Sequence, residues 1–280
     1  MKVLITGAAG QLGQAMVARM RVEHEVTAWA RADMDLTHHR AVRAAVDTLS
    51  PALIINCASF NQVDLAEDEQ LNALDVNAMV VGTLARAAAA VGATFMHYGT
   101  DFVFSGTASA PYRETDTPAP QSVYAQSKLV GEWLAADAPE HYVLRVESLF
   151  GGPHRRSSID RIADQVLSGA PAPVFHDRVV SPSFVADVVE ATMFVIGQRP
   201  AYGVYHCVNS GHATWFDVGR EIARRLGRPE TALTPVSVLD VPMRASRPQY
   251  AALDNGKLAA AGFVMPPWQD AIARYLVDRA

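Results

Sequence analysis

Short apolar runs alternate with longer helical patterns through the first half of the chain, and this alternation constrains the fold more than any other feature. Strands are predicted over 2–7 (KVLITG), 24–30 (HEVTAWA), 52–59 (ALIINCAS) and 93–104 (ATFMHYGTDFVF). Apolar residues at helical spacing predict helices over 12–20, 39–50 and 74–92. Near-continuous apolar strands separated by helices are typical of a parallel sheet covered on both faces. We therefore expect an α/β fold built on a Rossmann-like, doubly wound parallel sheet.

The alternation weakens in the second half of the chain. A helix over 123–137 and a strand over 141–151 continue it, but prolines then cluster at 171, 173 and 182 and the predicted elements shorten. Helices are expected near 216–227 and 268–278. The sequence thus predicts a dinucleotide-binding domain over 1–150. Residues 151–280 are expected to form mainly a smaller substrate-binding lobe, with segments that return to the main sheet.

Charge and cysteine content narrow the partners and the compartment. The formal net charge is −5, which argues against nucleic acid or an anionic membrane as the main partner. Cys57 and Cys207 lie in apolar runs, so buried free thiols in a reducing compartment are expected. We see no signal-peptide pattern and no apolar run of the roughly eighteen residues needed to span a bilayer. A cytoplasmic protein is the expectation.

A glycine-rich loop, GAAGQLG, joins the first strand to the first helix. Gly7 allows a tight turn, Gly10 lets the backbone approach a pyrophosphate, and Gly13 lets the helix pack on the strand. The helix that follows offers free N–H groups and a partial positive charge at its N-terminus. Gly7, Gly10, Gln11, Leu12 and Gly13 are therefore predicted to bind a dinucleotide, although an ordinary βα turn is the plain alternative.

The residues after the next two strands bear on the choice of cofactor. Arg31 follows the second strand, where an NAD enzyme often carries an acid, and an arginine there can pair with a 2′-phosphate. NADPH is therefore favoured and NADH is the alternative, with Arg31 as a plain surface charge nearly as well supported. The further predicted cofactor contacts are Asp35, Leu36, Cys57, Ala58 and Ser59.

Three polar residues suggest catalysis. Tyr124 and Lys128 lie four residues apart on a predicted helix, so both project from one face. A nearby ammonium is expected to favour the phenolate of Tyr124, which suits proton transfer near neutral pH. Thr100 emerges from the fourth strand at the edge where such sheets bind ligands, and its hydroxyl can bond a substrate carbonyl. Thr100, Tyr124 and Lys128 are the predicted catalytic residues.

These motifs resemble the dTDP-4-dehydrorhamnose reductase family of extended short-chain dehydrogenases. Matching stretches include GAAGQLG, DLAE (64–67), VNA (76–78), HYGTDFVFSG, YRETDTPAP, VYAQSKLVGE and RPQYAALD, so the resemblance covers nearly the whole chain. It implies that NADPH reduces the carbonyl of a 4-keto sugar attached to a nucleoside diphosphate. It also implies that Lys128 bonds the nicotinamide ribose and tunes Tyr124.

The chain departs from the family pattern on the substrate side. Where the reductases usually read RTSWVYG, this chain reads RVESLFG, which places Glu147 and Ser148 beside the expected sugar. A new carboxylate there would change which hydroxyls are recognised. Arg178 and Arg247 are the candidates for the diphosphate, because arginine matches phosphate bidentately. Asp101 and Phe102 complete the predicted substrate contacts.

Several alternatives stay open. A 4,6-dehydratase would carry a glutamate after Asp101, and Phe102 stands there instead. A 4-epimerase that retains NAD shares the catalytic residues, and a non-catalytic NADP-binding regulatory subunit is a third reading. Some relatives form a magnesium-bridged dimer through glutamates, but Ala15 and Ala186 stand at those positions. No metal is expected, and a monomer or weak homodimer is predicted.

Overall fold

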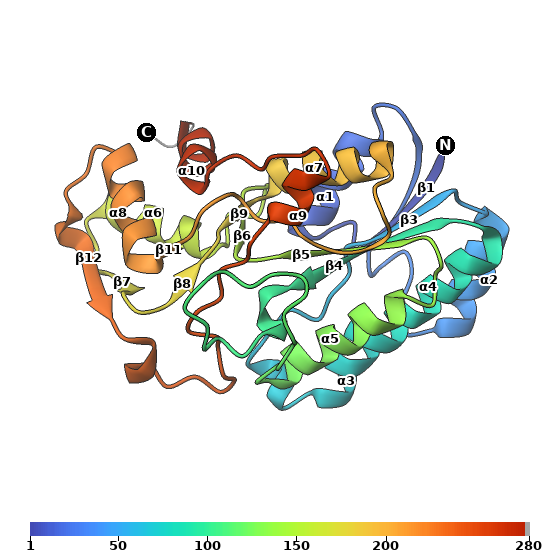
Figure 1. Ribbon diagram of the computed structural model, residues 1–280, viewed down its shortest axis with the longest axis horizontal. Coiled ribbons are helices and arrows are strands. Elements are labelled where there is room, and N and C mark those ends of the chain that lie inside the picture. Colours follow the sequence, from blue (N-terminus) through green and yellow to red (C-terminus); the bar gives the residue numbers. More distant parts are fainter. Residues whose placement is uncertain (278–280) are drawn as a thin grey trace.

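A six-stranded sheet runs through the middle of the molecule (Figure 1). The computed structural model describes residues 1–277. The strand order is β10-β5-β4-β3-β1-β2, and each neighbouring pair is parallel. The strands are β1 Lys2–Thr6, β2 Glu25–Trp29, β3 Leu53–Asn56, β4 Thr94–Thr100, β5 His141–Val146 and β10 Gly203–His206. The predicted doubly wound α/β fold is confirmed.

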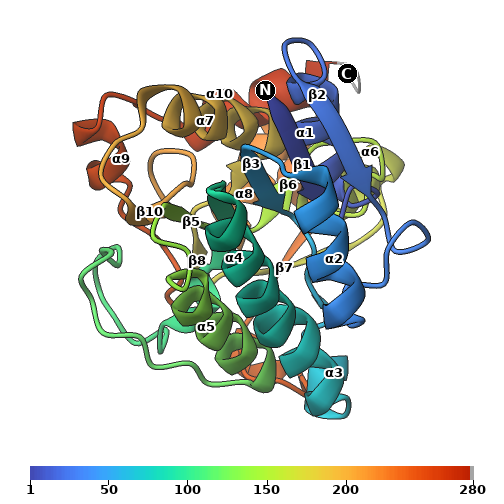
Figure 2. The ribbon, with the colours of Figure 1, turned by 90° about the vertical axis from the view of Figure 1, so that its right-hand side faces the viewer.

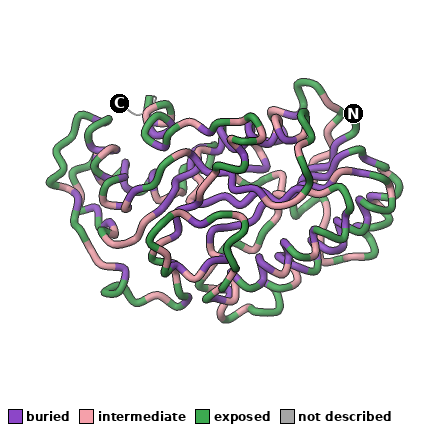
Figure 3. Tube along the Cα trace, viewed as in Figure 1, coloured by how far each residue is buried: buried purple, intermediate pink, exposed green. Residues whose placement is uncertain are grey.

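Helices cover both faces of this sheet (Figure 2). One layer contains α2 His39–Leu49, α4 Val80–Val91 and α5 Val123–Ala135, and the other contains α1 Gln11–Met20 and α7 Val185–Gln198. Strand side chains alternate between the two layers. Leu4 packs in the cluster with α2 and α4, whereas Val3 and Ile5 pack in the cluster with α1 and α7. Figure 3 shows the buried residues following the sheet and the inner helix faces.

The winding of the sheet reverses at β1. This strand pairs with β2 on one side and with β3 on the other, so the connections leave in opposite directions. Such a switch point opens a crevice beyond the carboxyl ends of the strands. Gly7 follows β1 and Cys57 follows β3, so the glycine-rich loop lies at this crevice.

Several predicted elements have different bounds, among them the strand expected over 141–151, which ends as β5 at Val146. The strand expected over 93–104 ends at Thr100, because the Thr100 hydroxyl accepts a hydrogen bond from the backbone N–H of Phe102 and a 3-10 turn, η3 Asp101–Val103, begins there. The helix expected over 74–92 is the end of a longer run. That run comprises α3 Gln70–Leu74, a π-helical turn η2 Asp75–Met79, and α4.

This continuous run, Gln70–Val91, has the length and apolar composition of a membrane span, which the sequence had not suggested. However, 56% of its most apolar window is buried inside the protein. Val80, Val81 and Leu84 pack against the sheet with α2 and α5. The apolar side chains of its α4 part therefore serve the core, whereas Leu71, Leu74 and Met79 in its first half are exposed.

A second, smaller core lies at the other end of the molecule, at the left of Figure 1. Three helices pack there around two-stranded pairs, and the chain beyond 151 also supplies β10 and α7 to the main sheet layers. That residues 1–150 bind the dinucleotide and residues 151–280 mainly bind the substrate remains a prediction. The elements are α6 Ser158–Ser168, α8 Trp215–Arg225, α10 Trp268–Leu276, β6 Leu149–Phe150 with β9 Ser183–Phe184, β7 Ala172–Phe175 with β12 Leu233–Val236, and β8 Val179–Val180 with β11 Ala213–Thr214. The short helices are α9 Gly256–Ala260, η1 Leu65–Glu67, η4 Glu230–Ala232 and η5 Val238–Asp240.

Candidate active site

The glycine-rich loop has no room for side chains. Gly7 has a φ of 65°, and a Cβ there would lie 2.5 Å from the backbone N of Ala58. A Cβ on Gly13 would lie 2.2 Å from the Gly7 carbonyl oxygen. Gly10 caps α1 without a side-chain hydrogen bond, so the first N–H groups of the helix remain free for an anion. The loop therefore fits the pyrophosphate of a dinucleotide.

The predicted adenosine end of this site lies between the loop and the end of β2. A cavity of about 470 Å³ is lined there by Ala8, Ala9, Gln14, Ala30 and Asp33, among others. The Asp33 carboxylate accepts the backbone N–H of Ala30 at 2.9 Å, a carboxylate in this region that the sequence reasoning did not consider.

The predicted residues around this end are placed as follows. Arg31 is exposed. Asp35 accepts hydrogen bonds from the hydroxyl and backbone N–H of Thr37, which lower its pKa. Leu36 packs against the core on the α2 side. The Gln11 side chain donates to the Gly151 carbonyl at 2.5 Å, so its backbone N–H is the part available to a cofactor.

A chain of buried polar side chains runs beneath the crevice. Asn56 Oδ1 accepts from the Thr6 hydroxyl at 2.6 Å and from the Ala58 backbone N–H at 3.1 Å. These two donors fix the orientation of the amide, so Asn56 Nδ2 donates to Nδ1 of His97 at 3.1 Å. The His97 ring therefore carries its proton on Nε2, and burial holds the pKa of His97 well below its usual value.

Lys128 is the last residue in this series of buried polar side chains. Its ammonium donates to the Tyr98 carbonyl at 2.7 Å and lies 3.3 Å from the protonated Nε2 of His97. The ring thus offers Lys128 no lone pair. Burial lowers the pKa of Lys128 to about 8, so this lysine is poised to titrate near neutral pH.

The segment after β3 joins the same region. Burial raises the pKa of Cys57 to about 12, which keeps its side chain a neutral thiol. The Ser59 hydroxyl donates to Asn77 Oδ1 at 3.0 Å, and Asn77 also donates to the Ser127 hydroxyl on α5. Asn77 lies in the π-helical turn η2 and thereby ties the loop after β3 to the helix that carries Tyr124 and Lys128.

Tyr124 and Thr100 meet at the end of β4. The Tyr124 phenol is hydrogen-bonded to the Thr100 hydroxyl, and its ring meets Phe102 edge-on with centroids 5.5 Å apart. The Thr100 hydroxyl donates in turn to Asp101 Oδ1 at 3.1 Å. Since that hydroxyl has one proton, its oxygen is the acceptor for the phenol. While Tyr124 is protonated and Asp101 is ionised, the order of donation therefore runs from Tyr124 through Thr100 to Asp101.

The electrostatics of Tyr124 differ from the sequence-based expectation. We expected the ammonium of Lys128 to favour the phenolate, but burial and the negative charge of Asp101 raise the pKa of Tyr124. Lys128 is directed to Tyr98 and His97 instead. The phenol therefore keeps its proton, which suits a group that donates a proton to a nascent alkoxide.

The predicted substrate side surrounds Asp101. The Arg178 guanidinium lies over the Phe102 ring, 5.7 Å from its centroid, and favours the ionised form of Asp101. Ser148, with a φ of 46°, follows Glu147 at the end of β5. Glu147 is 1% exposed, so its carboxyl group lies behind the surface of the site.

Arg247 is half-buried near Arg178. It donates to both carboxylate oxygens of Asp64 at 2.6 and 2.7 Å, and its charge lowers the pKa of Arg178. A diphosphate would have to compete with Asp64 for this guanidinium.

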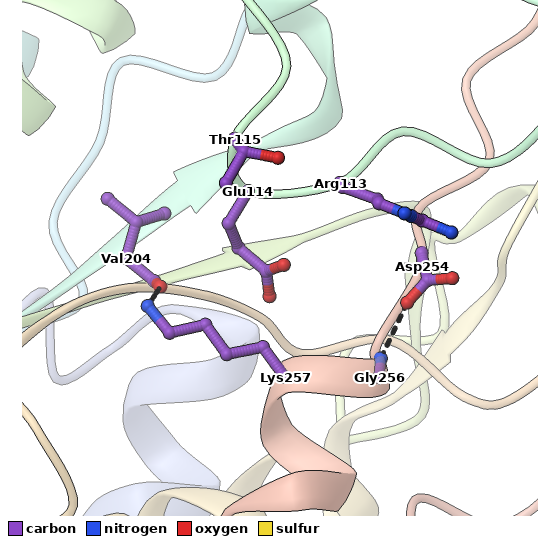
Figure 4. A pocket seen from close by; sticks show the side chains of 7 residues that line it. All are labelled: Arg113, Glu114, Thr115, Val204, Asp254, Gly256 and Lys257. Carbon is purple, nitrogen blue, oxygen red and sulfur yellow. Dashed lines mark hydrogen bonds between the residues drawn. The ribbon is translucent and has the colours of Figure 1, made fainter.

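A second cavity lies away from these residues. Its volume is about 830 Å³, and Figure 4 shows its lining at the outer edge of the sheet. There, Glu114 accepts the backbone N–H of His206 at 2.8 Å and Lys257 donates to the Val204 carbonyl at 2.6 Å. Both side chains occupy backbone groups of the edge strand β10, which protects that edge from pairing with another strand. None of Thr100, Tyr124 and Lys128 lines this cavity.

Besides Asp33, four buried residues of the site were missed by sequence reasoning: Thr6, Asn56, His97 and Asn77. All four are buried and hydrogen-bonded to one another or to the predicted residues. The available signal was their position, since three of them lie within or at the end of otherwise apolar strands.

Comparison with known proteins agrees with this geometry. The family model described as RmlD substrate binding domain matches residues 1–280. The dTDP-4-dehydrorhamnose reductase of Streptomyces griseus is 35% identical over 272 residues, covering 92% of this chain and 87% of that protein.

Two solved structures share the fold over nearly the whole chain. A dTDP-4-dehydrorhamnose reductase from Clostridium acetobutylicum has a TM-score of 0.93 at 33% identity, covering 99% of this chain and 98% of that one. Another from Bacillus anthracis, in complex with NADP, has a TM-score of 0.93 at 29% identity and covers 99% of each chain. The resemblance inferred from the motifs is confirmed. This chain belongs to the RmlD substrate binding domain family, the family of the dTDP-4-dehydrorhamnose reductases.

Proposed function

We infer that this protein is an NADPH-dependent reductase of a nucleotide-linked 4-keto sugar, of the dTDP-4-dehydrorhamnose reductase type. The observation that carries the inference is the Tyr124 phenol. It is kept protonated at the carboxyl edge of a sheet whose glycine-rich loop fits a dinucleotide. The relatives named above, one of them in complex with NADP, support the reaction and the cofactor.

The chain's own residues divide the work. The N–H groups at the start of α1 would hold the pyrophosphate, and Arg31 would pair with the 2′-phosphate. The bound cofactor supplies the hydride to the sugar carbonyl. Lys128 is proposed to bond the nicotinamide ribose. Its buried position and lowered pKa are compatible with this role.

Tyr124 is proposed to give its proton to the carbonyl oxygen as the alkoxide forms. The hydroxyl of Thr100 aligns the phenol, and the carboxylate of Asp101 keeps the phenol protonated until the substrate oxygen arrives. Arg178 and Arg247 are proposed to face the diphosphate, with Asp101, Phe102 and Ser148 around the sugar. These substrate assignments are proposals that rest on position.

The protein is further proposed to act in the cytoplasm as a monomer or weak homodimer, without a nucleic-acid or membrane partner. Its net negative charge and the burial of its apolar central helix support this. The substrate is then a soluble sugar nucleotide.

The Tyr124→Phe variant tests the inference. We expect kcat for NADPH oxidation to fall by roughly 10²–10⁴-fold, the usual contribution of a general acid. The affinity for NADPH should stay the same, because the ring and its edge contact with Phe102 remain. Substrates would be dTDP-, UDP- and GDP-linked 4-keto sugars, and Tyr202→Phe, an exposed tyrosine at the far edge of the sheet, is the matched control.

Three results would contradict the proposal. Unchanged turnover in Tyr124→Phe would remove the phenol as the acid. Tightly retained NAD in the purified protein, with no net NADPH oxidation, would point to a 4-epimerase. Cofactor binding without turnover on any keto sugar would point to a regulatory subunit.

A further inference from the structure

Two buried carboxyl groups lie at neighbouring strand ends beside Tyr124. Thr100, the last residue of β4, is paired with Val146, the last residue of β5, so Asp101 and Glu147 directly follow the ends of adjacent strands. Adjacent strands lie about 4.8 Å apart. Asp101 is 3% exposed and Glu147 is 1% exposed, so bulk water neither hydrates nor screens the two carboxyl groups.

Each carboxyl group has one oxygen with a donor and one without. Asp101 Oδ1 accepts the Thr100 hydroxyl at 3.1 Å, and Glu147 Oε2 accepts the backbone N–H of Ser181 at 2.6 Å. Asp101 Oδ2 and Glu147 Oε1 are both buried and find no donor in the part of the chain that the structure describes. Two unpaired buried carboxylate oxygens would be costly, whereas one proton placed between them satisfies both.

The surrounding charges decide which residue holds this proton. Burial and the charge of Asp101 raise the pKa of Glu147 well above its usual value. Burial also raises the pKa of Asp101, to about 6, but Arg178 and the Thr100 hydroxyl favour its ionised form. Of the two groups, Glu147 therefore keeps the proton at neutral pH.

Other titratable groups face the pair from the elements packed around it. Tyr124 of α5 lies beside Asp101, and Tyr250 lies beside Glu147. Arg178 faces both carboxyl groups, with Arg247 behind it. Arg247 is already paired with Asp64, so Arg178 is the cation that compensates a single negative charge on the pair, and a fully protonated pair would leave this guanidinium without a counter-ion.

We propose that Glu147 works as a neutral carboxylic acid whose Oε1–H donates to Asp101 Oδ2 and so positions the hydrogen-bond chain from Asp101 through Thr100 to Tyr124. The role rests on the proposed reductase function. Glu147 is a positioning residue, since its buried carboxyl group acts through Asp101 and Thr100. This role takes the place of the sugar contact expected from the sequence, because the Glu147 side chain is buried.

The direction of each hydrogen bond makes the role specific. Ionised Asp101 accepts from Glu147 and from Thr100, so the Thr100 oxygen stays an acceptor for the Tyr124 phenol. Without the Glu147 donor, Asp101 would take up a proton at a higher pH and become a donor itself. Thr100 would then turn its proton away from Asp101, and Tyr124 would lose its aligned acceptor.

Two substitutions of similar size separate this role from that of an ionised carboxylate. Glu147→Gln keeps an acceptor for Ser181 N–H and gives Asp101 an N–H donor, so kcat should stay within about threefold of the wild type with the same pH profile. Glu147→Leu removes the donor. Its kcat at pH 6 should fall by roughly tenfold or more, the scale of one hydrogen bond to a charged group, with KM little changed. The pH below which its kcat falls should rise, because Asp101 becomes easier to protonate.

An equal loss in both variants would overturn the proposal, because an ionised Glu147 would be damaged by Gln as much as by Leu. A pH profile of Glu147→Leu identical to that of the wild type would also overturn it, since a purely structural defect lowers kcat without moving an inflection.

Infrared spectroscopy of the cofactor-free protein tests the proton without any turnover. The wild type should show the C=O stretch of a buried protonated carboxyl group at pH 7.5, and Glu147→Gln should lack it. Absence of that band from the wild type would refute the neutral acid. If the wild type reduced no keto sugar, the proposed function would fail, while the band would still report the state of Glu147.

Discussion

Gly99 lies directly before Thr100 in β4, where the strand passes over a buried ion pair. The Arg145 guanidinium donates to Glu132 at 2.8, 3.0 and 3.2 Å, and both side chains are almost fully buried. A Cβ at position 99 would lie 2.2 Å from Glu132 Oε1 and 2.9 Å from Arg145 Cγ. The Gly99→Ala substitution therefore cannot be accommodated unless the carboxylate of Glu132 withdraws.

The cost follows from the burial of the pair. Breaking a buried ion pair destabilises a protein by about 3–5 kcal/mol, because one charge is left uncompensated. Since the methyl group displaces the carboxylate without removing it, we expect the lower end, about 3 kcal/mol. In a protein of this size each kcal/mol lowers the melting temperature by about 2–4 °C, so the midpoint should fall by roughly 6–12 °C.

Thermal and urea denaturation, followed by circular dichroism, measure this change. Gly197→Ala is the matched control: it lies in α7, and nothing approaches its added Cβ within 4 Å. That variant should be unchanged or up to about 1 kcal/mol more stable.

The double variant Gly99→Ala/Glu132→Ala tests the cause of the loss. Its further loss relative to Glu132→Ala alone should be much smaller than the loss in Gly99→Ala, since the obstructing oxygen is gone and only the contact with Arg145 Cγ at 2.9 Å remains. A Gly99→Ala midpoint equal to that of the wild type would refute the reasoning, and so would full additivity in the double variant.

Three further predictions concern the cofactor and pH. Gly13→Ala should abolish NADPH binding, measured by nucleotide fluorescence, because its Cβ would lie 2.2 Å from the Gly7 carbonyl oxygen; binding like that of the wild type would show that the loop can yield. Arg31→Asp should invert the ratio of kcat/KM for NADPH and NADH, and an unchanged ratio would remove Arg31 from cofactor selection. Burial and the charge of Arg145 lower the pKa of His206 from 6.5 to about 3, so its contribution to stability is present above pH 6.5 and is lost as pH falls toward 3. The shift corresponds to roughly 5 kcal/mol, so His206→Gln should show a flatter fall in urea stability over that range, and parallel curves would contradict it.

Position along the chain was enough to propose most of the candidate site. Thr100, Tyr124 and the glycine-rich loop could be named as candidates from the sequence because strand ends and helix spacing fix which side of the sheet they occupy. The hydrogen-bond partners of these side chains could not be predicted in this way. The ammonium of Lys128 donates to the Tyr98 carbonyl and lies beside the His97 ring, thirty or so residues away, and these contacts depend on how α5 packs over β4.

The sequence by itself determined the doubly wound sheet, the dinucleotide loop and the family, because each depends on periodicity or on short motifs within one βα unit. Only the tertiary structure decided the protonation of the site. Burial raised the pKa of Tyr124, where a neighbouring lysine had suggested the opposite. The pairing of β4 with β5 placed Asp101 and Glu147 next to each other at the ends of these two strands. The free energy of a charge depends on how much water and which partners surround it, and the surroundings exist only once the chain has folded.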